Sequence, residues 1–158
     1  MEQFDPNIPG LITGDVTTVI VIDPDAAAIP FQVGNHVLNT DEEFFVDVSW
    51  ELQGVLVPLW LAALGGNWNV QLFAESLGGG PEILLARDDT VAADPAVRTY
   101  SARLTVPPTS LEEGNPGSNT SGIYKLVVSV FLDSTLGEPG FDITGFSEGP
   151  IIQVENPV

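Results

Sequence analysis

Apolar and polar residues alternate with a period of two along several short stretches of this chain. In the clearest of them, residues 43–52, the apolar residues at alternate positions are Phe44, Val46, Val48, Trp50 and Leu52. Because successive side chains of a β-strand point to opposite faces, this pattern predicts an antiparallel strand with one buried face. The same alternation predicts strands at residues 68–76, 98–106 and 124–132.

Further strands are expected where the pattern is weaker. A β-branched run predicts a strand at residues 15–23. Shorter strands are expected at 82–86 and 151–155, and 29–38 is a weak candidate. The 16 glycines and 13 prolines divide the chain into short segments, which favours many strands and turns over long helices. The predicted fold class is all-β: an antiparallel sandwich of about seven to eight strands with one or two short helical turns.

The remaining segments are expected to be loops, turns and an N-terminal arm. Residues 88–96 are polar and predict a loop. Ser110, followed three residues later by Glu113, matches a capping box that opens one helical turn. The prolines and the glycine within residues 1–13 predict an irregular arm, followed by a single sandwich domain at 14–158.

The chain is strongly acidic, with 22 acidic residues, four basic ones and a formal net charge of −18. Such a surface repels phosphate groups, so we expect neither nucleic acid nor anionic lipid surfaces as partners. No apolar run reaches the roughly 20 residues of a membrane-spanning helix, so membrane insertion is not expected. The charge also opposes a homo-oligomer unless its contacts are apolar or bridged by cations. If Met1 is the native start, the lack of a secretory signal predicts a cytoplasmic protein.

Residues 120–128, Thr-Ser-Gly-Ile-Tyr-Lys-Leu-Val-Val, resemble the tyrosine corner of immunoglobulin-like domains. In that family a glycine leads into the penultimate strand, and a tyrosine near its start bonds back to the upstream chain. Gly122 and Tyr124 match these two positions. Thr120 stands where an aspartate is expected, and Leu126 stands where antibody domains carry a cysteine. The resemblance implies an immunoglobulin-like sandwich with a structural corner, and no particular function.

Residues 55–64 do not follow the alternation of the strands. They form a nearly continuous apolar run in which Pro58 is placed to open a helical turn and residues 65–66, both glycines, to close it. The turn either plugs an open end of the sandwich or presents an apolar ridge to a partner. The candidate interface residues are Leu56, Leu59, Trp60, Leu61 and Leu64.

A second apolar set lies on strand faces that are expected to point outward. Its members are Phe45, Phe73, Val127 and Phe131. Phe73 and Phe131 are expected to share one outer face, with Phe45 on the other sheet. These residues are either covered by another part of the chain or contact another subunit, so Phe73 and Phe131 are also candidate interface residues.

Residues that could carry chemistry are few. The chain has no cysteine, which excludes disulfides and thiolate metal sites, and its one histidine, His36, is expected at a turn. No nucleophile-elbow or phosphate-loop pattern is present, so we expect neither an enzyme nor a bound cofactor. Four acidic turn residues are weak candidates for calcium ligands. They are Asp23, Asp25, Asp88 and Asp89.

Together these features predict a non-enzymatic module that binds another protein, as an assembly subunit or an adaptor. The contact is expected through residues 55–64 or through an exposed sheet edge. The alternative is a carbohydrate- or calcium-dependent ligand-binding module in which Trp60 or Trp68 is a stacking platform. An exposed tryptophan beside polar side chains would favour that alternative.

Overall fold

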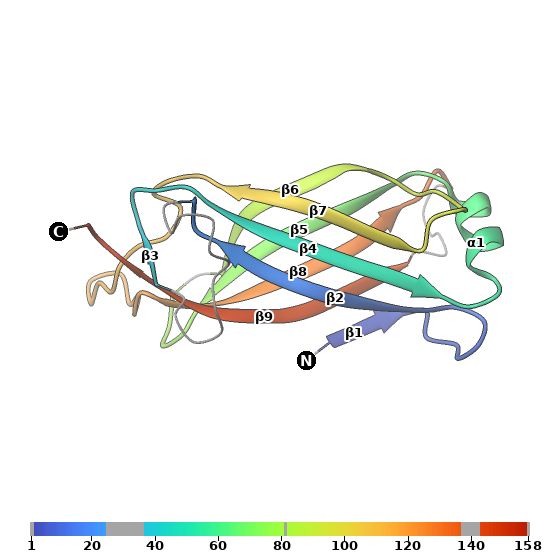
Figure 1. Ribbon diagram of the computed structural model, residues 1–158. Helices are drawn as coiled ribbons and strands as arrows, with labels where there is room; N and C mark the ends of the chain where they lie inside the picture. The colour runs from blue at the N-terminus through green and yellow to red at the C-terminus, as the bar shows by residue number, and fades with distance from the viewer. Residues whose placement is uncertain (1, 25–36, 81, 137–142, 158) are drawn as a thin grey trace.

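The computed structural model describes residues 2–24, 37–80, 82–136 and 143–157, which contain nine strands and one helix (Figure 1). The elements in chain order are β1 (Glu2–Asp5), β2 (Thr13–Ile22), β3 (Val37–Asn39), β4 (Phe44–Gln53), α1 (Val57–Leu64), β5 (Asn67–Ser76), β6 (Glu82–Ala92), β7 (Thr99–Val106), β8 (Ile123–Asp133) and β9 (Thr144–Glu155). The strands form two sheets in a sandwich-like arrangement, which confirms the predicted all-β class.

The larger sheet has the strand order β1-β9-β8-β5-β6, and β3 also pairs with β9. The smaller sheet has the order β2-β4-β7. All of these pairs are antiparallel except β3–β9. The sheet edges approach each other along two seams, where β6 contacts β7 and β2 contacts β9. Because β1 pairs with β9 and also contacts β2, the segment 1–13 expected to be irregular contains a strand at the second seam.

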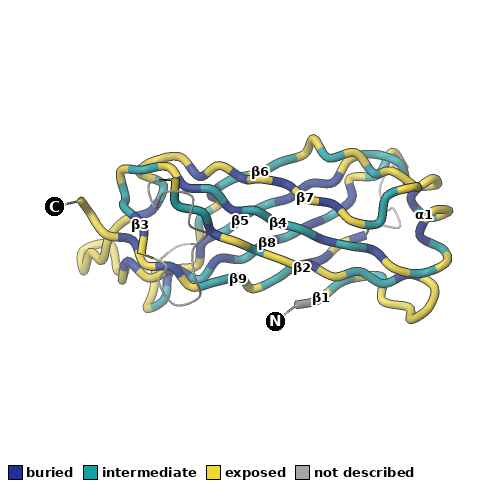
Figure 2. The backbone as a smooth tube through the Cα atoms, viewed as in Figure 1, coloured by how far each residue is buried: buried dark blue, intermediate teal, exposed yellow. Residues whose placement is uncertain are grey.

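The core follows from the alternation along the central strands, which is visible as changing burial in Figure 2. The alternate residues of β4 are buried, from Phe44 to Leu52, and the same holds along β7 and β8. Three aromatic side chains meet at one end of this core. The ring of Trp68 lies 5.7 Å from that of Trp50 and 5.4 Å from that of Tyr100, measured between centroids. Facing strands of both sheets therefore contribute to one shared core.

One predicted loop is largely wrong. Strand β6 continues to Ala92, so most of the polar loop expected at residues 88–96 is strand. The ladder with β5 extends to the pair Asn67–Ala92, and Thr90 Oγ1 donates to Asp88 Oδ1 at 2.7 Å. An edge strand with little burial needs no apolar alternation, and for that reason the sequence pattern did not indicate it.

Two weaker predictions have different outcomes. Residues 107–114 form turns and irregular structure, so the helical turn expected at Ser110 is wrong. Ser110 Oγ donates to the carbonyl oxygen of Pro107 at 2.7 Å, which places the hydroxyl in a local turn and not at a helix cap. Of the weak strand expected at 29–38, residues 37 and 38 are described, and both belong to β3.

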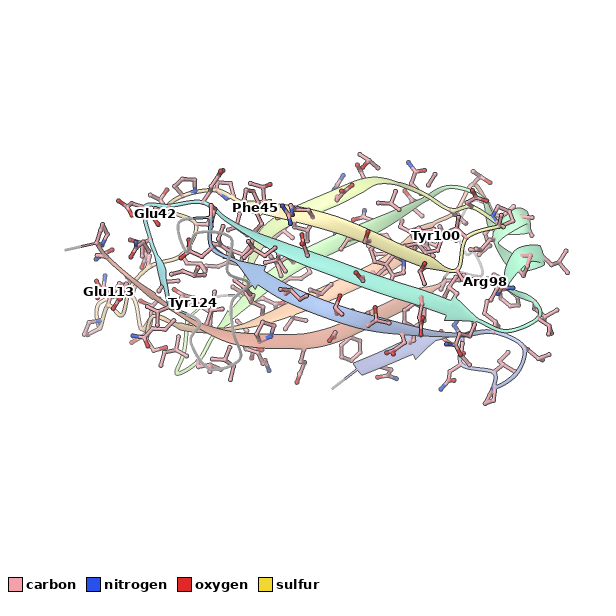
Figure 3. All side chains as sticks on the ribbon, in the orientation of Figure 1. Glu42, Phe45, Arg98, Tyr100, Glu113 and Tyr124 are labelled. Atoms are coloured by element: carbon pink, nitrogen blue, oxygen red, sulfur yellow. The ribbon has the colours of Figure 1, made fainter. Side chains whose placement is uncertain are left out.

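The hydroxyl of Tyr124 bonds back to the chain upstream of β8, at the end of the sandwich opposite α1 (Figure 3). It donates to the carbonyl oxygen of Glu112 at 2.8 Å and accepts from the N–H of the same residue at 3.3 Å. Gly122 has a φ of 74°, and a Cβ at this position would crowd the backbone nitrogen of Gly114. The contact that the resemblance to a tyrosine corner implies is therefore present.

A second buried tyrosine has the same role nearer to α1, and the sequence analysis missed it (Figure 3). The hydroxyl of Tyr100 lies 3.0 Å from the carbonyl oxygens of both Asp94 and Val97, and it accepts from the N–H of Asp94 at 3.2 Å. It thus ties the loop before β7 to the core.

We expect Tyr124→Phe to destabilise the protein by about 1–2 kcal/mol, because it removes the hydroxyl that pairs both backbone groups of Glu112. Burial of the phenol raises the pKa of Tyr124. The folded state therefore holds this proton more tightly than the unfolded state, whose tyrosine pKa is about 10. The stability from this group is complete below pH ~10 and is lost as pH rises through the folded-state pKa.

Urea unfolding of the wild type and of Tyr124→Phe at a series of alkaline pH values measures this effect. The wild type is expected to lose stability more steeply than the variant. A residual slope is expected in both proteins, because a hydrogen bond to Glu75 raises the pKa of Lys125 and acts in the same direction. Equal slopes in the two proteins would contradict the prediction.

Candidate functional site

The apolar run 55–64 forms the helix α1 at one end of the sandwich (Figure 1). A proline lies in the first turn, where its missing N–H costs nothing, and the helix ends at Gly65, whose φ is 60°. The N–H of Gly65 donates to the carbonyl oxygen of Leu61 at 2.9 Å. Local sequence therefore determines where this helix begins and ends, as predicted.

One face of α1 is packed into the sandwich and another is exposed. Val57, Leu61 and Leu64 are buried in the core. In contrast, Leu59 is 70% exposed, and Val55, just before the helix, is 74% exposed. The helix therefore plugs the end of the sandwich and also exposes apolar side chains, and the contact of these side chains with a partner stays a prediction.

The exposed face of α1 borders an apolar groove of ≈ 410 Å³. The residues that line it are Leu56, Leu59, Trp60, Ala63, Leu64 and Leu136. We call this set the α1 groove. Leu61 was expected in the same surface, but it is fully buried beneath the helix, because it follows Val57 by one helical turn on the inward face. Leu61 is therefore a core residue and not a contact residue.

Several hydrogen bonds fix α1 to its neighbours. On the N-terminal side, Arg98 Nη1 donates to the carbonyl oxygen of Gly54 at 2.9 Å. The N–H of Leu56 donates to the carbonyl oxygen of Leu11, also at 2.9 Å. On the C-terminal side, the backbone N–H and the hydroxyl of Thr135 donate to the carbonyl oxygen of Leu64 at 2.9 and 2.8 Å. The α1 groove is therefore held by protein contacts at both ends of the helix.

The electrostatic setting of α1 is unusual for this protein. The chain carries a net charge of −18, yet no residue from Gly54 to Gly66 is charged. Charged groups are strongly hydrated, so their absence lowers the desolvation cost of covering this end of the molecule. The residues that line the α1 groove are thus apolar and uncharged.

The second candidate surface, on the outer face of the larger sheet, is less exposed. Phe131 pairs with Asn69 and Phe73 with Val127 in adjacent strands, so Phe73 and Phe131 lie on one face, and both are half-buried. Phe45 lies on the smaller sheet, where the guanidinium carbon of Arg103 stands 5.4 Å from the ring centroid. These rings are partly covered by their own neighbours.

The three candidate calcium ligands that the structure describes do not come together. Asp23 follows β2 at one seam, whereas Asp88 and Asp89 lie on β6 at the other, and Asp89 pairs with Arg87 at 2.8 Å. In the described part of the chain, no three His, Cys, Asp or Glu side chains are grouped so that they could hold a metal ion. Asp25 and His36 lie outside the described residues.

The stacking platform of the alternative hypothesis is reduced to one residue. Trp68 is completely buried between Trp50 and Tyr100, so it cannot stack on a sugar. Trp60 is partly buried and lines the α1 groove together with leucines and an alanine. The environment of both tryptophans therefore favours an apolar contact over a carbohydrate site.

The groove also contains a residue that the sequence analysis missed. Leu136 follows β8 and is distant from α1 in sequence, and the sequence pattern around it gives no indication of this contact.

No protein-family model matches the chain, and no curated protein matches it. Among the described residues, no helix has both the length and the apolar character needed to cross a bilayer.

Proposed function

We propose that this protein is a non-enzymatic interaction module that binds an apolar segment of another protein in the α1 groove. The observation that carries the proposal is the apolar surface at α1, where Val55 and Leu59 are strongly exposed and no residue from Gly54 to Gly66 is charged in a chain of net charge −18. Exposed apolar patches of soluble proteins are typical of interaction sites, and tryptophan is enriched where binding energy is concentrated.

The rigidity of the site supports the same function. The carbonyl oxygen of Leu64 accepts two hydrogen bonds from Thr135, and Arg98 holds the entrance of the helix. A groove that is already ordered loses little conformational entropy when a partner binds. The acidic surface elsewhere keeps free copies apart and steers the protein toward a less acidic partner.

We also propose that the sandwich is immunoglobulin-like. The order β2-β4-β7 corresponds to strands A-B-E of that fold, and β9-β8-β5-β6 corresponds to G-F-C-C′. In this correspondence Tyr124 lies near the start of strand F, and the buried Trp68 lies on strand C, where immunoglobulin domains carry a tryptophan. Domains of this fold serve assembly and adhesion among other roles, so the fold is compatible with the proposal without selecting it.

The proposal is tested with Leu59→Asp. This change places a charge in the α1 groove, and we expect it to lower partner affinity about tenfold or more, while stability changes by less than about 0.5 kcal/mol. The matched control is Leu84→Asp, which introduces the same charge at a leucine that is 52% exposed on β6, in the sheet edge.

Pull-down from the native extract identifies proteins that bind the wild type, and calorimetry with the purified partner measures the affinity of each variant. A partner that is lost with Leu59→Asp and retained with Leu84→Asp supports the α1 groove as the binding site. A partner that binds both variants equally, or a wild-type chain that recovers no companion, contradicts the proposal.

A further inference from the structure

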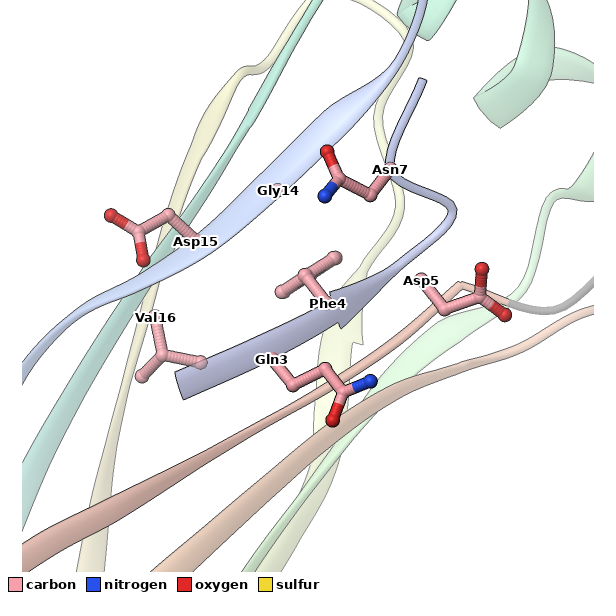
Figure 4. Close-up of a pocket in the computed structure, with 7 residues that line it drawn as sticks. All are labelled: Gln3, Phe4, Asp5, Asn7, Gly14, Asp15 and Val16. Atoms are coloured by element: carbon pink, nitrogen blue, oxygen red, sulfur yellow. The ribbon is translucent and has the colours of Figure 1, made fainter. Parts of the chain in front are cut away.

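Phe4, in strand β1, is held between two glycines of different sheets. It faces Gly145 in the β1–β9 ladder, and a Cβ added at Gly145, or at Gly14 in β2, would overlap the Phe4 ring. At both positions the three nearest atoms all belong to that ring, and neither glycine has a left-handed φ. Figure 4 shows Phe4 between β1 and the position of Gly14. The two glycines form a slot for this ring, which we call the Phe4 slot.

The other contacts of β1 are few and polar. Four residue pairs join it to β9, and Phe4 is its one apolar residue. A groove of ≈ 600 Å³ runs beside β1 and β2, with Gln3, Asn7 and Asp15 in its lining (Figure 4). The Phe4 ring therefore supplies most of the apolar contact that retains the strand.

The turn that follows β1 is held by contacts of its own. Residues 8–12 form a turn in which the carbonyl oxygen of Ile8 accepts from the N–H of Ile12 at 3.0 Å, and Ile12 is fully buried. The N–H of Leu56 donates to the carbonyl oxygen of Leu11, so the turn is also tied to the entrance of α1. Pro6 and Asn7 between β1 and this turn form a short hinge, and short hinges favour exchange of an element between copies.

Beyond β1, a groove follows the seam between β2 and β9. The ladder of β1 reaches Ser147 of β9, and a further groove of ≈ 500 Å³ lies past this point. It is bordered by Val16–Val19 of β2 and by Ser147–Pro150 of β9. An incoming extended segment can therefore enter the seam next to the bound strand before it displaces that strand.

We propose that the Phe4 slot can accept β1 of a second copy of this chain in place of its own, so that two copies exchange this strand when the contact within one chain is blocked. Every copy carries the segment that the slot already binds, and the contacts made between copies are those made within one copy. Within one chain the tethered strand has an effective concentration in the millimolar range, so wild-type copies at micromolar concentration remain closed. Exchange becomes visible when the contact within the chain is blocked. This site lies at the β2–β9 seam and is separate from the α1 groove.

The test uses two complementary full-length variants. Phe4→Ala has an empty slot and lacks the ring, whereas Gly145→Ala retains the ring but fills the slot with a methyl group. Mixed at about 0.15 M salt, where repulsion between acidic copies is screened beyond ~8 Å, the two are expected to form a 1:1 dimer of twice the 16.8 kDa monomer mass. Each variant alone, and each mixed with the double variant Phe4→Ala/Gly145→Ala, is expected to remain monomeric by light scattering.

A second measurement covers the case in which Gly145→Ala does not fold. A labelled peptide with the sequence of residues 1–8 is titrated into full-length Phe4→Ala, and its anisotropy is compared with that of the same peptide carrying alanine at position 4. Binding of the phenylalanine peptide is expected to be roughly tenfold tighter or more, the factor that burial of an aromatic ring gives. Equal binding of the two peptides overturns the proposal. The proposal is also overturned if both variants fold and their mixture stays monomeric. This holds even if the peptide binds, because the slot then accepts a free strand but not the strand of a second copy.

Discussion

Trp68→Ala is expected to destabilise this protein by about 3–5 kcal/mol, a large part of the 5–15 kcal/mol that keeps a typical domain folded. Trp68 is completely buried on β5, and its ring contacts Trp50 of the opposite sheet at 5.7 Å between centroids. Removal of the indole leaves a cavity between the two sheets that neighbouring strands cannot close without breaking their ladders. Urea unfolding followed by circular dichroism measures the loss.

Trp68→Phe is the matched control, with an expected cost of about 1–2 kcal/mol. The indole nitrogen of Trp68 is buried without a hydrogen-bond partner, so phenylalanine loses apolar volume but no hydrogen bond. A loss below about 1 kcal/mol for Trp68→Ala would mean that the two sheets do not share the core described above. The same experiment with added sugar checks the alternative function, for which Trp60 is the stacking platform that remains, and stabilisation by carbohydrate would support that alternative.

The strands that were predicted well are those with one buried face. Strands β4, β5 and β8 lie inside their sheets, and β7, at the edge of the smaller sheet, also buries one face against the core. Their inward positions must be apolar and their outward positions can be polar, which produces the alternation seen in the sequence. The boundaries of β4 and β8 differ from the predicted ones by one residue at each end. Strand β6 has little burial along its length, so burial imposes no alternation, and its second half was therefore mistaken for a loop.

Contacts between distant segments could not be predicted from the same pattern. Strand β1 is held by β9, about 140 positions further along the chain, and Gly145 gives no sign in the sequence that it accommodates Phe4. In the candidate site, the helix ends were predictable from Pro58 and from the glycines after Leu64. The inward face was not predictable, because nearly every residue of α1 is apolar and hydrophobicity alone gives no orientation.

The entrance of α1 depends on a glycine, and Gly54→Ala is expected to destabilise the protein by about 3 kcal/mol. Gly54 has a φ of 124°, a conformation that side chains rarely adopt, and a Cβ there would overlap the carbonyl group of Leu11. That backbone cannot move aside freely, because the oxygen of Leu11 accepts from the N–H of Leu56 and Arg98 holds the oxygen of Gly54. The strain therefore falls on the segment that positions the α1 groove.

Gly10→Ala separates the clash from the effect of φ alone. Gly10 also has a positive φ, 80°, but a Cβ there meets no atom within 4 Å, so its replacement is expected to cost about 1 kcal/mol. Chemical unfolding of both variants gives the two free energies, and calorimetry with a partner gives their affinities. Gly54→Ala is expected to lower both stability and partner affinity, while Gly10→Ala retains the affinity. If both variants lose the same stability, the overlap with Leu11 is not what makes glycine necessary at position 54. The backbone around α1 can then shift more easily than its hydrogen bonds indicate.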